Sequence, residues 1–350
     1  MPRTCPRRKR ALAAVLALLA CSPDLPATRW MGKFLHFATD LDATICEGTF
    51  PVQDRFIELL AGEFAAEIES PIPLVFLSPG DVDDACDLAD SYGCYTDGRA
   101  YTMTPFQLHE LTHAVADAAD WNGPTSFAEG LAGVYSTDAW ASVTRVPVEE
   151  GLRSFDFSHD HYYTMALFVR FLIERHGLAP LGAFMAATDK RDDFDSFAPV
   201  FAQHFGEPLD AAVLAFDDYP TCSAWENRIA LVECAQPELP WDGLSWTAEV
   251  ELSCTSDDVI GPLDDNDAPL MATTRTLVVE ADIDALAVVD FQGGGLAGAR
   301  ITRCGSCWDA LDLQIPAGTA TNISLPAGRY YVWFLAEAET SGTMSLSLTR

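Results

Sequence analysis

Two histidines four residues apart carry the clearest chemical signal in this chain. His109 and His113 enclose Glu110 in the order H-E-x-x-H. On an α-helix, side chains four positions apart project from one face, about 6 Å apart along the axis, so both imidazoles can reach one metal ion. Zn²⁺ suits such a site, because it takes histidine nitrogen at about 2.0–2.1 Å and keeps a position for water in catalytic centres. Glu110 could then take a proton from that water.

The motif requires a helix, and its surroundings predict one. Thr104 is expected as the N-cap and Pro105 as the first helical residue. From Phe106 onward, apolar residues recur near a helical period. The run 120–124 reads D-W-N-G-P, and these turn-forming residues should end the helix.

A third protein ligand must come from outside the motif, and Glu129 is the candidate. It lies just past Pro124 in the run F-A-E-G-L-A. One turn and a second helix would return its carboxylate to the metal. Alternatively, Ser126 and Glu129 have the spacing of a capping box, in which Glu129 would only close a helix start. We favour ligation, because the carboxylate completes the upstream histidine pair.

These residues resemble a known family. H-E-L-T-H-A-V followed by Asp117 resembles the active-site helix of thermolysin, and H-E-x-x-H followed by E-G-x-A resembles the gluzincin metallopeptidases. The resemblance implies zinc on His109, His113 and Glu129, with Glu110 as general base. The chain lacks thermolysin's aspartate one turn beyond the glutamate, so no substrate preference is carried over. Asp117 either orients a ligand imidazole or is a solvated carboxylate.

Peptide hydrolysis also needs a donor for the developing oxyanion. Gluzincins show a tyrosine shortly before a helix with the pattern F-x-x-x-L. Aligning that pattern with residues 168–172 puts Tyr162 at the tyrosine position, so the resemblance implies Tyr162 as the donor. Tyr163, His159 and His161 are alternatives, and Tyr162 could instead be a packing residue.

The N-terminus predicts export. Residues 1–21 read as a signal peptide, with basic residues first and then an apolar stretch too short to span a bilayer. The sequence L-L-A-C ending at Cys21 resembles a bacterial lipobox, which implies a lipid anchor on Cys21. The alternative is an ordinary cleaved signal peptide in which Cys21 has no role.

Cysteine usage agrees with export, because an even set in an exported protein is typical of disulfides. Apart from the two N-terminal cysteines, eight remain: Cys46, Cys86, Cys94, Cys222, Cys234, Cys254, Cys304 and Cys307. We expect local loops closed by Cys86 with Cys94 and by Cys222 with Cys234. The C-G-S-C run 304–307 lacks the second pair of a zinc ribbon, and it also lacks the thioredoxin-like β-α unit of a redox motif. We therefore interpret it as a structural disulfide.

Charge restricts the partners. With 21 basic and 52 acidic residues, the net charge is −31, which repels nucleic acid and anionic lipid. We therefore expect a peptide or protein substrate, no nucleic-acid partner, and membrane attachment only through Cys21. Two acidic clusters could bind Ca²⁺, but neither matches an EF-hand loop, so solvated carboxylates are expected. They comprise Asp81, Asp83, Asp84 and Asp87, and Asp264, Asp265 and Asp267.

The predicted fold class is α+β, with a zincin-like metallopeptidase domain over 31–240 and an all-β sandwich over 245–350. In the first domain, Arg99–Met103 is expected as the edge strand before the metal helix. The other expected elements are strands at 33–38 and 73–78 and helices near 53–66, 161–176, 179–188, 195–205 and 208–217.

The second domain is predicted from its alternating strands and the Gly, Pro and Asp residues between them. Its run L-P-A-G-R-Y-Y-V-W-F and the closing S-G-T-M-S-L-S-L resemble pre-peptidase C-terminal-like domains, which are accessory modules. We expect a chain that ends near Pro240 to fold and bind zinc without it.

The sequence thus predicts an exported zinc metallopeptidase, in particular an endopeptidase. The alternative is a non-catalytic surface lipoprotein, with a zincin-like core and a sandwich that binds protein or glycan. Glu110 favours the enzyme, because a binding protein has no use for a base beside the metal.

Overall fold

The structure is a computed structural model that describes residues 25–88, 91–136, 144–154, 159–239, 241, 243–263 and 269–350, without the side chains of His159 and Asp160. The expected signal peptide with Cys21 and the acidic cluster at 264–267 lie outside the described residues. Across the described ranges, no helix combines the length and the apolar character that a membrane crossing needs.

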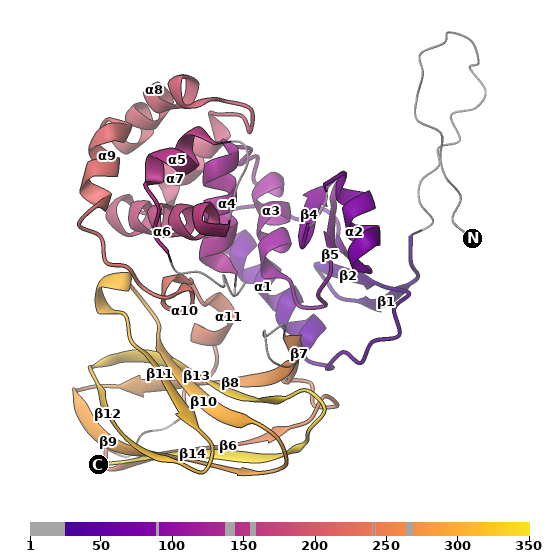
Figure 1. Ribbon diagram of the computed structural model, residues 1–350, viewed down its shortest axis with the longest axis vertical. Helices are drawn as coiled ribbons and strands as arrows, with labels where there is room; N and C mark the ends of the chain where they lie inside the picture. The colour runs from indigo at the N-terminus through magenta and orange to yellow at the C-terminus, as the bar shows by residue number, and fades with distance from the viewer. Residues whose placement is uncertain are drawn as a thin grey trace.

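The chain is mixed α+β (Figure 1). Its first part holds the elements β1 (Thr28–Met31), β2 (Leu35–Ala38), α1 (Thr49–Phe64), β3 (Ile72–Phe76), α2 (Pro79–Cys86), β4 (Gly93–Thr96), β5 (Arg99–Thr102), α3 (Leu108–Ala118), α4 (Thr125–Tyr135), α5 (Val148–Arg153), α6 (His159–His176), α7 (Leu178–Ala186), α8 (Phe194–Phe205), α9 (Leu209–Phe216), α10 (Ala224–Asn227) and α11 (Leu231–Cys234).

The second part is all β apart from one 3-10 turn. It holds β6 (Ser245–Leu252), β7 (Ile260–Leu263), β8 (Leu270–Val279), β9 (Ile283–Gln292), β10 (Ala297–Arg303), the turn η1 (Cys307–Asp309), β11 (Asp312–Pro316), β12 (Ala320–Leu325), β13 (Gly328–Glu337) and β14 (Gly342–Thr349).

A five-stranded sheet in the order β1-β2-β3-β5-β4 forms one side of the first part. The strands β2, β3 and β5 are parallel, and β1 and β4 pair antiparallel at the two edges. The predicted strand at 99–103 exists as β5, but its prediction as the edge strand is wrong. Asp97 and Gly98 both adopt positive φ, as a two-residue hairpin turn requires, and this hairpin adds β4 outside β5.

Helix α4 packs closely against α6, and small residues allow the approach. A Cβ atom on Gly130 would lie 2.7 Å from the carbonyl oxygen of Met165, and one on Gly133 would lie 2.9 Å from the Cβ of Ala166. Both contacts are too short for larger side chains. The close packing fixes the position of α4, which carries Glu129, relative to the helix that carries Tyr162.

The second part is a sandwich of two antiparallel sheets, in the orders β11-β10-β13-β8-β7 and β12-β9-β14-β6. Alternating side chains of both sheets form one core between them, with Trp246 and Tyr330 among its fully buried members. This agrees with the predicted sandwich texture of the C-terminal segment.

The outer face of the first of these sheets packs on the helices of the N-terminal part (Figure 1). Trp333 of β13 is fully buried there, and its ring meets that of Trp225 at a centroid distance of 5.3 Å. Arg329 donates to the carbonyl oxygens of Cys234 and Gln236. The two parts therefore share buried apolar surface as well as hydrogen bonds.

Three of the four disulfides strengthen this association. The predicted pair Cys86–Cys94 is confirmed, whereas the expected Cys222–Cys234 pair is wrong. The cysteines of the C-G-S-C run do not bond to each other either, because each is met by a cysteine from the helical part across the interface. The three pairs that join the two parts are Cys46–Cys254, Cys222–Cys307 and Cys234–Cys304. Several disulfides indicate an oxidising, extracellular environment.

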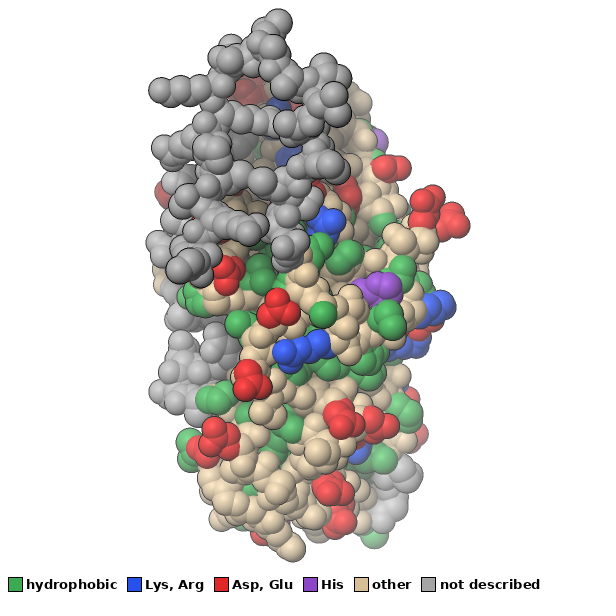
Figure 2. All heavy atoms as spheres, turned by 90° about the vertical axis from the view of Figure 1, so that its right-hand side faces the viewer, with side chains coloured by type: hydrophobic (Ala, Val, Ile, Leu, Met, Phe, Trp, Pro, Cys, Tyr) green, Lys and Arg blue, Asp and Glu red, His purple; other side chains and the backbone are tan. Residues whose placement is uncertain are grey.

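Carboxylates are spread over the surface, as the net charge requires, with few basic side chains among them on the face drawn in Figure 2. In the described cluster at 81–87, Asp81 accepts from the Ser78 hydroxyl and Asp83 from the Ser91 backbone. Among the described residues, this cluster does not form a group that could hold a metal ion.

Candidate metal centre

The metal-binding helix α3 starts later than predicted. Its N-cap is Gln107, whose side-chain oxygen accepts from the backbone N–H of His109 at 3.0 Å. Thr104 and Pro105 therefore precede the helix, and their predicted roles as cap and first helical residue are wrong. The reason lies in Gln53 of α1, which is fully buried and fixes the segment before the helix. Its amide nitrogen donates to the Pro105 carbonyl, and its amide oxygen accepts from the Gln107 backbone N–H.

We expect Gln53→Ala to lower the free energy of unfolding by about 2–4 kcal/mol, because it leaves a buried N–H and a buried carbonyl without partners. Urea denaturation of the variant measures the change. Glu58→Gln on the same helix, at a half-exposed site, is the control and should change stability by less than about 0.5 kcal/mol. Equal effects of the two substitutions would show that Gln53 does not hold the start of α3.

The three predicted ligands converge. The Nε2 atom of His109 lies 3.0 Å from Oε2 of Glu129, and Nε2 of His113 lies 3.5 Å from the same oxygen. The ligand atoms of all three residues lie within 4.8 Å of one another. Among the described residues, no other group of three or more acidic, histidine or cysteine side chains lies close enough together to hold a metal ion.

The spacing suits zinc. Two ligands at about 2.05 Å from a tetrahedral ion are about 3.3 Å apart, and the two imidazole–carboxylate distances of 3.0 and 3.5 Å lie on either side of that value. Two nitrogens and one oxygen are also the donor set of a catalytic rather than a structural zinc centre, since structural sites use four protein ligands. The residues present therefore fit the ion.

Glu129 reaches the site from the second turn of α4, as predicted. The helix begins at Thr125 with Pro124 as its N-cap, and no side chain caps it. The capping-box alternative for Ser126 and Glu129 is therefore excluded. Burial alone would raise the pKa of the Glu129 carboxyl, but the charges and hydrogen bonds of His113 and His109 outweigh it and lower the pKa below its ordinary value. The carboxylate form is the form that binds a metal.

Glu110 lies on the buried side of α3 and is 6% exposed. Gly93, at the start of the edge strand β4, lies against it. A Cβ atom on Gly93 would be 3.1 Å from Oε1 of Glu110 and 2.7 Å from the backbone oxygen of Tyr101. Because Gly93 has no side chain, there is room for the Glu110 carboxylate, and the backbone of the edge strand β4 can lie next to that carboxylate.

Tyr162 lies beside the three ligands. It falls within the first turns of α6 rather than before the helix, and its ring centroid is 6.1 Å from that of His109. Burial, and then the charges of Glu129 and Glu110, raise the pKa of the Tyr162 phenol above its ordinary value. The phenol therefore keeps its proton at neutral pH and can donate a hydrogen bond.

The alternatives to Tyr162 have different surroundings. Tyr163 points elsewhere: it is fully buried, and its hydroxyl donates to the Cys222 carbonyl at 2.5 Å. His161 lines a separate hollow with Glu149, Glu150 and Arg153. The side chain of His159 lies outside the described residues.

Asp117 is exposed and accepts a hydrogen bond from the Tyr95 hydroxyl of β4 at 3.0 Å. This contact ties the second half of α3 to the edge strand. Burial and the Asp117 charge raise the pKa of the Tyr95 phenol. The sequence offered two interpretations of Asp117: a partner of a ligand imidazole, or a purely solvated carboxylate. Neither included the hydrogen bond from Tyr95.

Sequence reasoning missed the residues that position the centre, namely Gln53, Gln107, Gly93 and Tyr95. Only the edge strand had a local signal, the Asp97-Gly98 pair that is typical of tight hairpins. A glutamine in the middle of an amphipathic helix does not reveal that it is buried, and its partners follow from the tertiary fold.

No protein-family model matches this sequence, and neither does any curated protein. One similar solved structure is the pre-peptidase C-terminal domain of a collagenase from Bacillus anthracis, with 16% identity over 30% of this chain and 90% of that domain and a TM-score of 0.23. A Podospora anserina GH26-CBM35 β-(1,4)-mannanase has 12% identity over 30% of this chain and 27% of its own, with a TM-score of 0.17. TM-scores this low carry no argument about function.

Proposed function

We propose that this protein is an exported zinc metallopeptidase of the gluzincin type, with a zincin-like first domain over 31–240 and an accessory sandwich over 245–350. The observation that carries the proposal is the convergence of His109, His113 and Glu129 on one point, with Glu110 on the same helix. The H-E-x-x-H and E-G-x-A motifs support it. The proposed substrate is a peptide or protein.

When bound, Zn²⁺ would supply the Lewis acid that polarises a carbonyl and acidifies a water. Glu110 would take the proton of the attacking water and pass it to the leaving amine, for which its place in the first turn of α3 is suitable. The Tyr162 phenol would donate a hydrogen bond to the developing oxyanion, because it lies beside the three ligands and keeps its proton at neutral pH. Glu129 and the two imidazoles would hold the ion.

The remaining parts of the proposal concern location. Four disulfides fit an exported protein, and Cys21 is proposed as a lipid anchor on the cell envelope. The high negative charge supports the absence of a nucleic-acid partner.

Cleavage of a mixed peptide library by the purified mature protein tests the function. We expect about one Zn²⁺ per chain, cleavage that a chelator abolishes, and recovery of cleavage when Zn²⁺ is restored. A protein without tightly bound zinc, or cleavage that survives removal of the metal, would contradict the proposal. Tight binding of a protein or glycan with no cleavage would favour the alternative, a non-catalytic surface lipoprotein.

Tyr162→Phe should lower kcat by about 10²-fold, the scale of losing one oxyanion donor, while zinc content and KM change little. Tyr163→Phe is the matched control. It also removes a phenol hydroxyl, but from the neighbouring residue, which faces the core. We expect that control to lower the melting temperature and to leave kcat within a few-fold of the native value. Steady-state kinetics on both variants decides, and a larger kcat loss for Tyr163→Phe would transfer the role away from Tyr162.

A further inference from the structure

The C-G-S-C run of the sandwich lies at the interface with the helices, and its two cysteines belong to two different disulfides. Its two cysteines bond outward to two different cysteines, in the pairs Cys234–Cys304 and Cys222–Cys307. Cysteines separated by two residues are also close enough to bond with each other, as in thiol–disulfide exchange motifs. The run can therefore adopt two bonding patterns, one that joins the two parts of the protein and one that stays within the loop.

The two interface disulfides differ in access. Cys222 and Cys307 are buried, at 4% and 3% exposure, whereas Cys234 and Cys304 are both partly exposed. Cys234 and Cys304 also line a cavity of about 360 Å³ between helices α6 and α11 and the sandwich loop. A thiol from solution can therefore reach Cys234–Cys304 but not its neighbour.

The charges around this cavity do not oppose an incoming thiolate. Two buried arginines line it, Arg170 paired with Glu174 at 2.8 Å and Arg228 paired with Glu233. The other disulfide whose two cysteines are both partly exposed, Cys86–Cys94, is attached to the last residue of helix α2. This helix and its C-cap carry four aspartates: Asp81, Asp83, Asp84 and Asp87. Because the attacking species is an anion, the aspartates slow exchange there relative to the ion-paired arginines.

We propose that the C-G-S-C run is a thiol–disulfide exchange site, at which a dithiol reductant converts two interface disulfides into one disulfide within the loop. A thiolate of the dithiol attacks the Cys234 sulfur and releases Cys304 as a thiolate. Cys304 attacks the Cys307 sulfur, which breaks Cys222–Cys307, forms Cys304–Cys307 and leaves Cys222 as a thiol. The second thiol of the reductant then releases Cys234. The reductant loses two electrons and two protons, and Cys222 and Cys234 gain them.

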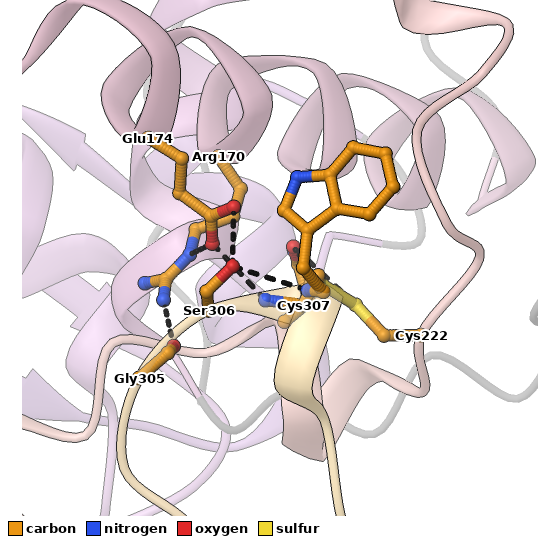
Figure 3. Close-up of polar contacts among 8 residues, drawn as sticks. Arg170, Glu174, Cys222, Gly305, Ser306 and Cys307 are labelled. Carbon is orange, nitrogen blue, oxygen red and sulfur yellow. Dashed lines mark hydrogen bonds and ion pairs between the residues drawn. A yellow bond between two sulfur atoms is a disulfide. The ribbon is translucent and has the colours of Figure 1, made fainter.

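This exchange would alter contacts on both ends of α6. Figure 3 shows the loop docked on its C-terminal half, where Glu174 accepts from the Ser306 hydroxyl at 2.8 Å and from the Cys307 backbone N–H at 3.1 Å. At the other end, the Cys222 carbonyl accepts from Tyr163, the neighbour of Tyr162. Cys46–Cys254 still joins the two parts elsewhere, so the sandwich would loosen at this loop without separating.

Limited reduction of the folded mature protein tests the proposal, with dithiothreitol as the probe, followed by alkylation and mass-spectrometric mapping of the disulfides. We expect Cys222 and Cys234 to be alkylated together, Cys304 and Cys307 to be joined, and the pairs Cys46–Cys254 and Cys86–Cys94 to be opened at least several-fold more slowly. Exchange of the Cys307 backbone amide with deuterium should rise in the same sample, because its contact with Glu174 is lost.

A double variant, Cys222→Ser with Cys307→Ser, is the matched control. It keeps Cys234–Cys304 and removes the partner of the second step, so Cys234 and Cys304 should both be alkylated. In the native chain, alkylation of Cys304 with Cys222–Cys307 intact would overturn the proposal, and so would opening of Cys86–Cys94 first. These readouts do not depend on hydrolysis, so failure of the proposed function leaves this test unaffected.

Discussion

Glu110→Gln is expected to abolish peptide cleavage while leaving the zinc in place. Glutamine has nearly the shape of glutamate, so it should fit the same space against Gly93 and preserve α3. It cannot accept a proton from water or return one to the leaving amine. General base catalysis contributes about 10²–10⁴-fold, and one group serves both proton transfers here, so we expect kcat to fall by at least about 10³-fold. Steady-state kinetics and metal analysis of the same sample measure the two quantities.

His113→Ala is the companion variant, because it removes a ligand rather than the base. It should lose both zinc and activity, whereas Glu110→Gln should lose activity alone. Full cleavage by Glu110→Gln would remove Glu110 as the base and leave the convergence of the three ligands without a catalytic explanation. Loss of zinc in Glu110→Gln would indicate instead that the carboxylate supports the metal centre structurally.

The candidate ligands could be predicted from the sequence because their signal is local. His109 and His113 are one helical turn apart, and Glu129 stands at a short spacing in the next helix, so few arrangements of the chain bring them together. The same local logic identified most helices and strands and the Cys86–Cys94 pair, whose members are eight residues apart. A pattern that closes over a short segment needs no knowledge of the tertiary fold.

Most of the features that were predicted wrongly have long-range causes. Cys222 is separated from its partner by 85 residues and Cys234 by 70, and no local spacing indicates either pair. The cap of α3 depends on Gln53, 54 residues before the Gln107 backbone N–H that it binds. The strand at 99–103 was predicted as the edge strand, but β4 pairs outside it through a two-residue turn. For the disulfides and the helix cap, the deciding contact lies in a distant part of the sequence. The edge strand is different, because the Asp97-Gly98 turn beside it is a local signal.

The structure also revises what to expect of a chain that ends near Pro240. The alternating strands after residue 245 favour an independent module, and a truncated chain would then fold alone. Three disulfides and a shared core now argue against that outcome. Trp333 and Tyr331 of β13 are almost fully buried in the same apolar cluster as the helices, so truncation would expose the surface beneath them. It would also leave Cys46, Cys222 and Cys234 without their partners.

The expected loss is comparable to the stability of a whole domain. A native disulfide contributes about 2–4 kcal/mol, so three of them approach the 5–15 kcal/mol that is typical of a whole domain. We therefore predict that the chain ending at Pro240 shows no cooperative thermal transition and binds less than stoichiometric zinc. The full chain with Cys46→Ser and Cys254→Ser is the control: it loses one of the three disulfides but keeps the interface, so it should melt cooperatively at a lower temperature. A truncated chain that melts like the full protein and keeps its zinc would show that the helices form their own folding unit, and that the disulfides tie together parts already stable alone.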